Sequence, residues 1–152
     1  MKSVSDPETL ASLIERLERL TPGSERRWGT LTPHEMLCHL GDATALVLGE
    51  RPADPPVIDR RRPVIKWIAL SVPLPWPRGY PTRRSLDPKL DGTKPSDFQA
   101  DHARAVKGLK RVASAGPASL TPVHGVFGSM TLSDWHRWAY RHTHHHLRQF
   151  GL

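Results

Sequence analysis

Cysteine is nearly missing from this chain: Cys38 is the only one in 152 residues, so no internal disulfide can form. Cysteine usage therefore gives no reason to expect an oxidising compartment. Long apolar runs are missing too. The longest, residues 64–74, is too short to span a bilayer and is interrupted by Lys66. The apolar residues near the amino terminus recur only among charged ones, unlike a signal peptide. These absences predict a cytoplasmic protein with no membrane partner.

Acidic residues are scarce relative to basic ones: 15 Asp and Glu stand against 22 Lys and Arg, a formal net charge of +7. A basic surface would favour a nucleic-acid partner. The surplus is concentrated, however, because residues 51–96 hold ten Lys and Arg and four Asp and Glu, which leaves only +1 for the rest of the chain. No predicted helix has a basic face with interleaved aromatic residues, so nucleic-acid binding is the weakest of our functional hypotheses.

Alternation of apolar and polar residues with period two is absent, and four segments instead repeat apolar residues at helical spacing. Helix-start signals precede all four segments: Asp6-Pro7, Thr32-Pro33-His34-Glu35, Ser96-x-x-Gln99 and Thr131-x-x-Asp134. The first three segments end at Pro22-Gly23, Gly49 and Gly116-Pro117. A chain of 152 residues suits one domain. The sequence predicts an all-α fold, a single four-helix bundle over residues 1–152.

A long connection, residues 50–96, separates the second and third predicted helices. It holds ten of the fifteen prolines and has helical periodicity only from about Arg62 to Leu70. Connections of this length inside a compact domain are usually functional or covering loops. We expect this proline-rich, basic connection to border the functional site and to attract an anionic ligand.

Histidines are concentrated near the carboxyl terminus: five of the nine lie between His136 and His146. On a helix, His142 and His146 stand one turn apart and continue the inward stripe of Trp135 and Trp138. His39 lies on the inward stripe of the second helix. Taken alone, it would be interpreted as a core histidine that is hydrogen-bonded to a backbone carbonyl. With two more inward histidines nearby, the three predict a metal site.

Three neutral imidazoles leave a divalent ion at least one open position, as in catalytic zinc sites, although imidazole also suits nickel, copper and iron. Such an ion acidifies a bound water or thiol. The His-Glu-x-x-His motif of metalloproteases, which supplies a carboxylate base, is absent. This pattern favours a reaction whose nucleophile is activated by the metal alone.

These residues resemble a known family. A histidine on the second helix, His142-x-x-x-His146 and the following Gln149 are similar to the DinB/YfiT-like superfamily of metalloenzymes, and residues 31–40 and 145–151 resemble a bacterial subfamily of unknown function within it. The resemblance implies a four-helix bundle that binds a divalent ion, often zinc or nickel, through His39, His142 and His146. Characterised members of the superfamily that the chain resembles include thiol-dependent S-transferases and a maleylpyruvate isomerase. Here arginine, Arg148, replaces the usual glycine of the His-x-Gly-Gln motif.

Other residues are candidates for supporting or substrate-facing roles. His145 and Gln149 flank the proposed ligand His146, and Asp42, one turn beyond His39, is a candidate to orient that ring. His124, whose Phe127-Gly128 context is also similar to the subfamily, either faces substrate or is a plain loop histidine. We expect Cys38 to be buried and inert, and His34, His136 and His144 to lie at the surface.

Two hypotheses lead. The first is a metal-dependent transferase or hydrolase, in particular a thiol-dependent S-transferase that uses a low-molecular-weight thiol. The second is a metal-binding bundle without catalysis. Catalytic residues, the substrate and the choice between monomer and homodimer stay open at this level.

Overall fold

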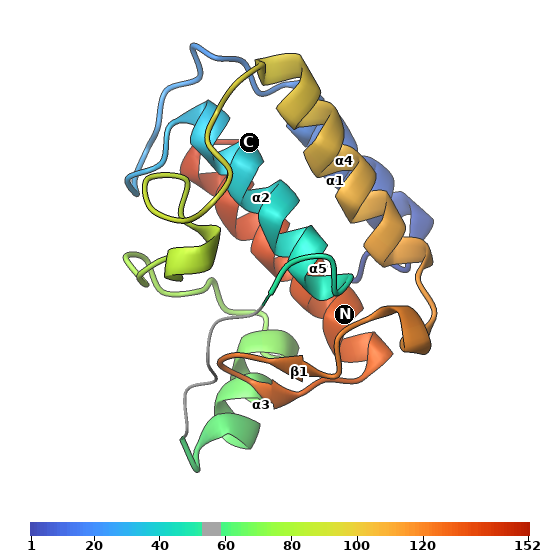
Figure 1. Ribbon diagram of the computed structural model, residues 1–152. Helices are drawn as coiled ribbons and strands as arrows, with labels where there is room; N and C mark the ends of the chain where they lie inside the picture. Colours follow the sequence, from blue (N-terminus) through green and yellow to red (C-terminus); the bar gives the residue numbers. More distant parts are fainter. Residues whose placement is uncertain (53–58) are drawn as a thin grey trace.

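The computed structural model describes residues 1–52 and 59–152, which are mostly helical with one small sheet (Figure 1). The α-helices are α1 (Pro7–Glu18), α2 (Pro33–Val47), α3 (Arg62–Ser71), α4 (Phe98–Ser114) and α5 (Leu132–Gln149). Two single-turn 3₁₀ helices, η1 (Arg84–Leu86) and η2 (Pro117–Ser119), and the strands β1 (Val123–His124) and β2 (Gly128–Ser129) complete the described elements.

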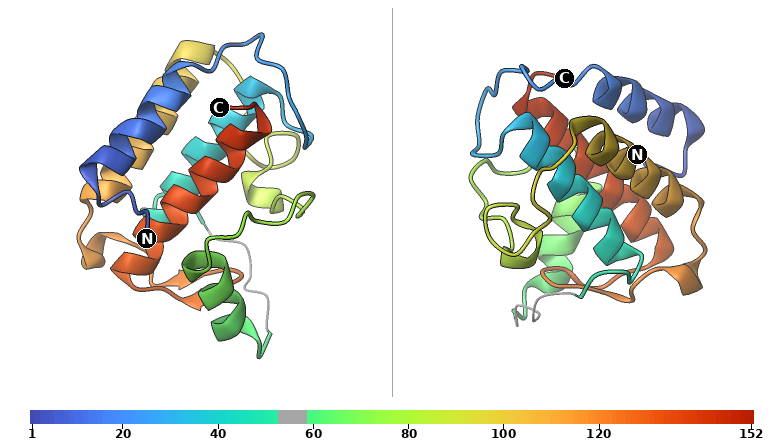
Figure 2. Two further views of the ribbon diagram at one scale, coloured as in Figure 1. Left: turned by 180° about the vertical axis from the view of Figure 1, so that it is seen from behind. Right: turned by 45° about the horizontal axis from the view of Figure 1, so that its top comes forward.

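The four long helices pack around a shared core. α1 contacts α4 and α5, and α2 contacts the same two helices, so all four helices border one interior (Figures 1 and 2). The apolar residues that the helical periodicity selected are buried, among them Leu13, Leu17, Leu109, Trp135 and Leu147. Burial of such side chains contributes about 1.5–3 kcal/mol each. Within the described residues, no helix is both long and apolar enough to cross a lipid bilayer.

Capping boxes begin two of these helices. Thr32 with Glu35 caps α2 and Thr131 with Asp134 caps α5, as the sequence predicts. The predicted cap of α4 is wrong by one residue: Asp97, not Ser96, accepts the hydrogen bond from the amide of Ala100, at 2.7 Å. Asp97 is the better N-cap residue because its carboxylate also complements the positive end of the helix dipole.

The described part of the 50–96 connection covers the flank of α2 that faces away from α1 (Figures 1 and 2). It contains the predicted short helix, α3, and is tied to α2 through Asp42. This buried carboxylate accepts hydrogen bonds from the amide and hydroxyl of Thr93, at 2.7 and 2.6 Å, and from Arg104, at 3.0 Å. Residues 53–58 of the connection lie outside the described part.

A two-stranded antiparallel pair, β1–β2, was not predicted. Val123 pairs with Ser129 and His124 with Gly128, so each strand has only two residues. Two residues cannot display period-two alternation, which explains why the sequence pattern missed them. The hairpin lies beside α3 at one end of the molecule (Figure 1) and directly precedes α5.

Gly108 places the backbone of α4 against α2, which gives the first testable prediction. A Cβ atom here would overlap the side chain of Thr44, whose hydroxyl bonds to carbonyls of its own helix. We expect Gly108→Ala to lower the free energy of unfolding by about 1–3 kcal/mol, since overpacking outweighs the helix propensity of alanine. Gly23→Ala, where a Cβ meets open space, should stay within about 0.5 kcal/mol. Urea denaturation measures both, and a Gly108→Ala variant as stable as the native protein would contradict the packing argument.

Candidate metal centre

Three histidine rings meet between α2 and α5. His39 comes from the middle of α2, and His142 and His146 come from α5, one turn apart. The ring centroids are 4.6–5.0 Å apart, and one nitrogen of each ring lies within 4.8 Å of the other two. His39 and His146 are buried and His142 is partly buried. The i, i+4 spacing on α5 is what aims two of the rings at the same point.

Hydrogen bonds on the outer side of two rings fix where their lone pairs point. The Nδ1 atom of His39 donates to the carbonyl oxygen of Leu86, at 2.9 Å, because a carbonyl can only accept. In the same way, Nδ1 of His146 donates to Oε1 of Gln149, at 2.9 Å. Each ring therefore carries its proton on Nδ1 and presents a bare Nε2 to the centre, the arrangement that oriented metal ligands adopt.

One separation between ring nitrogens, that of a hydrogen bond between His39 and His142, is close to the spacing around a shared ion. The Nε2 atoms of His39 and His142 are 3.0 Å apart, and two nitrogens bound to one tetrahedral zinc would be about 3.3 Å apart. Burial lowers the pKa of all three histidines, and neighbouring rings lower the pKa of His142 and of His146 further. The three side chains are therefore neutral at pH 7, as metal ligands must be.

Tryptophans enclose the cluster. Trp138 stacks on His142, with centroids 4.5 Å apart and planes 11° from parallel. Trp76, from the connection, lies over His142 and His145, at 6.3 and 5.9 Å. Its indole donates to the carbonyl of Ala69, at 2.8 Å, which fixes its position. The connection thus borders the cluster twice, through Trp76 and through Leu86.

His145 lies beside the cluster rather than in it. Its ring meets the edge of His146 at 5.4 Å and packs between Trp28, at 4.8 Å, and Trp76. Burial, together with the charge of Arg148, lowers its pKa to about 4. A neutral ring held between two indoles supports the neighbouring ligand by packing.

The expectation that Asp42 orients His39 is not met. The carboxylate of Asp42 bonds to Thr93 and Arg104, and Arg51 lies 3.5 Å away, whereas the ring of His39 bonds to Leu86. Asp42 follows His39 by three residues, but its side chain turns to the cations of α4 and the connection. A backbone carbonyl has no sequence signature, so this partner of His39 could not be identified from the residue pattern.

His124 lies in the hairpin before α5. Its Nδ1 accepts hydrogen bonds from the amides of Val126 and Phe127, at 3.1 and 3.2 Å, and its ring stacks on Phe127. The ring also contacts Trp138, which packs on His142. Burial, with Arg83 and Arg62 nearby, lowers the pKa of His124 to about 4. His124 thus holds the turn in shape as a neutral acceptor, and it contacts Trp138, which packs on the cluster.

Three histidines expected at the surface are buried or partly buried. His136 is buried and bonds to the carbonyl of Val112 at 3.1 Å, because the side of α5 that carries it packs on α4. His34 is partly buried and pairs with Asp101 at 2.9 Å. His144 is also partly buried, and its Nδ1 accepts from Arg16 at 3.0 Å. The prediction from helical periodicity underestimated the burial of these side chains on α2 and α5, because it assumed that each helix packs on one side only.

A second group of potential ligands, His34, Cys38 and Asp101, joins α2 to α4. Its chemistry does not suit a cation. The guanidinium of Arg104 lies 3.6 Å from Asp101, and that carboxylate already accepts from His34 and from the amide of Ser96. Burial and the charge of Asp101 raise the pKa of the Cys38 thiol to about 12, so it stays protonated. This cluster is a structural link between two helices.

Comparison with known proteins gives one match. A family model described as "Protein of unknown function (DUF1569)" matches residues 3–151. No curated protein and no solved structure matches the chain.

The acceptor role of His124 predicts a pH dependence. Between its native pKa of about 4 and the ordinary value of 6.5, the unfolded chain binds more protons than the native protein. The free energy of unfolding should be retained above pH 6.5 and fall as the pH drops toward 4, by about 2–3 kcal/mol for this residue. His124→Asn keeps an acceptor but does not titrate, so its loss over this range should be smaller by that amount. Urea denaturation of metal-free protein at several pH values measures the difference, and parallel curves for the two proteins would contradict it.

Proposed function

The chain belongs to the DUF1569 family, and from the geometry of its histidine cluster we propose that it binds a divalent transition-metal ion through His39, His142 and His146. The observation that carries this proposal is the orientation of the rings. Leu86 and Gln149 engage Nδ1 of His39 and of His146, which leaves Nε2 of each ring free to bind an ion. The free Nε2 of His39 accepts a hydrogen bond from Nε2 of His142 at 3.0 Å, and a bound ion would replace the proton between them. Three imidazoles suit zinc and nickel alike, so the proposal names the ligands and leaves both ions as candidates.

We place the protein, as one domain, among the DinB/YfiT-like four-helix bundles. The resemblance of the two end motifs supports this placement, and so does the packing of α1, α2, α4 and α5 around the site. Ligand sites of bundles commonly form from side chains on facing helices. Here α2 and α5 face each other across the cluster.

The proposed activity is that of a metal-dependent transferase, with a low-molecular-weight thiol as cosubstrate. When bound, the ion would lower the pKa of a water or thiol at an open position, which makes a nucleophile at neutral pH. The chain's own residues orient the ligands through Leu86 and Gln149 and restrict water through Trp76 and Trp138. Within the described residues, no carboxylate hydrogen-bonds to the three rings. This lack of a base favours thiol transfer over hydrolysis, and a non-catalytic metal-binding bundle is the alternative.

Metal content tests the ligand set. We expect His39→Ala, or the double substitution His142→Ala with His146→Ala, to remove most of the divalent metal, because two or fewer imidazoles bind far more weakly than three. Elemental analysis of tag-free protein after dialysis gives the stoichiometry. His144→Ala is the matched control, since it lies on the same helix with Nδ1 engaged by Arg16. Full metal retention in the double variant would refute the proposed ligands.

A cobalt-substituted protein tests the thiol. If a thiol enters the site as proposed, titration with glutathione, mycothiol, bacillithiol or cysteine should produce a sulfur-to-cobalt charge-transfer band in the near ultraviolet. The double variant His142→Ala, His146→Ala should show no such band at the same cobalt concentration. An unchanged spectrum across all four thiols, in protein that retains cobalt, would exclude the thiol cosubstrate while leaving metal binding intact.

A further inference from the structure

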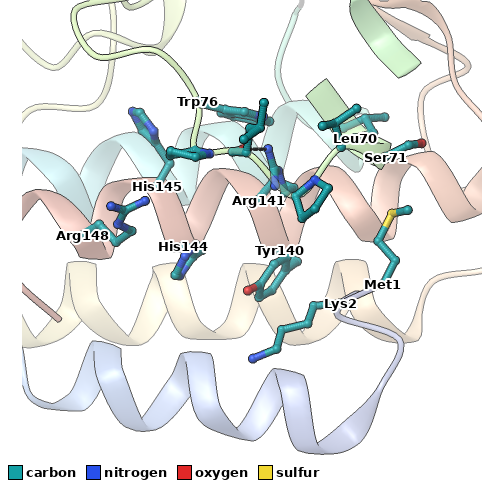
Figure 3. A pocket seen from close by; sticks show the side chains of 14 residues that line it. Met1, Lys2, Leu70, Ser71, Trp76, Tyr140, Arg141, His144, His145 and Arg148 are labelled. Atoms are coloured by element: carbon teal, nitrogen blue, oxygen red, sulfur yellow. Dashed lines mark hydrogen bonds between the residues drawn. The ribbon is translucent and has the colours of Figure 1, made fainter. Parts of the chain in front are cut away.

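A cavity of about 390 Å³ lies beside the histidine cluster, where the connection crosses α5 and the chain's amino-terminal residues (Figure 3). Its size falls in the range of sites that take a small molecule. Figure 3 shows Trp76 and His145 at one end and Met1 and Lys2 at the other, with Arg141 between them. The cavity is separate from the cluster, because His39, His142 and His146 do not line it.

The charge of the cavity wall has one sign. Lys2, Arg141 and Arg148 line it, and no aspartate or glutamate does. Within the described residues, the side chains of Lys2 and Arg148 form no hydrogen bond or ion pair, and both are exposed. A cavity wall that carries cations and no carboxylate has a positive potential, so an anion in the cavity would be bound favourably.

Further donors line the same wall. Arg16 donates to Nδ1 of His144, so the proton of that neutral ring is on Nε2, where it can be donated. Tyr140, whose ring stacks on His144 at 5.5 Å, adds a hydroxyl. Hydrogen-bond donors from side chains thus surround the cavity, which suits the several acceptor oxygens of a carboxylate, sulfonate or phosphate.

The opposite wall is apolar. The connection supplies Leu74, Trp76 and the prolines between and beside them. Arg141 holds this wall in place, because its guanidinium donates to the carbonyl of Leu74 and lies over Trp76, 5.8 Å from the ring centroid. A ligand that fits both walls has an anionic group at one end and an apolar body at the other.

We propose that this cavity binds a small organic anion with an apolar body, its charge attracted by Lys2 and Arg148 and its body packed against Trp76. This proposal does not require metal in the cluster. The cations of this cavity are not those of the basic connection, residues 50–96, which the sequence analysis expected to attract an anionic ligand. Arg61 pairs with Asp59, and Arg62 donates to carbonyls of Gly125 and Val126, so these basic residues of the connection are already engaged.

The test compares two fluorescent probes of nearly equal shape, 8-anilinonaphthalene-1-sulfonate and uncharged N-phenyl-1-naphthylamine. The sulfonate should bind with one-to-one stoichiometry and at least about tenfold more tightly, which is the worth of a charge-assisted hydrogen bond. Its affinity should fall as salt is raised from low concentration. Equal affinity for the two probes, or an affinity independent of salt, would overturn the proposal.

Charge reversal locates the site. Arg148→Glu and Lys2→Glu should each weaken sulfonate binding about tenfold or more, and both positions are exposed, so the variants should keep the native melting temperature. Lys110→Glu is the matched control. It makes the same change of net charge on an exposed residue of α4, outside this cavity. An equal loss of affinity in Lys110→Glu would mean that net charge alone attracts the probe, and the assignment to this cavity would be wrong.

Discussion

The hydrogen bond from His39 to the carbonyl of Leu86 is the contact on which the candidate site depends. It fixes the tautomer of a buried ring, and it joins α2 to the connection at η1. Because Leu86 is itself buried, the connection cannot move away from α2 without exposing apolar surface and leaving the ring without its acceptor. The long connection is therefore part of the site's framework, and its position and the direction of the His39 lone pair are set together.

Packing on two sides, by α4 and by the connection, explains the unusual burial of α2. A helix at the edge of a bundle normally has a solvent-exposed face, yet Gly41, Asp42 and Thr44 are buried together with the apolar stripe. α4 covers one side, where Gly108 lets it come close, and the connection covers another through Thr93 and Leu86. Burial of Asp42 is tolerated because two arginines and Thr93 satisfy its oxygens.

Local sequence patterns predicted what short-range physics determines. Cap residues and helical periodicity located the long helices, and the i, i+4 spacing with a third inward histidine predicted that His39, His142 and His146 would come together. The patterns failed where long-range contacts decide. Leu86 orients His39 with a backbone group, Trp76 arrives from a segment without periodicity, and His136 is buried by packing between α5 and α4. None of these contacts produces a periodic pattern of residues in the sequence.

Electrostatics connects the cluster with the cavity beside it. Three neutral imidazoles would leave the full charge of a divalent ion in a low-dielectric site, and the nearest carboxylate on α2, Asp42, is already paired with Arg104 and Arg51. The cavity beyond His145 adds Arg141 and Arg148 and no acidic residue. Asp42 and Asp87 act electrostatically on His39, but no acidic residue lines the cavity. An anionic group in the cavity would supply the negative charge that the cavity lining lacks, and the proposed thiolate at the ion would do the same for the cluster on the other side of Trp76.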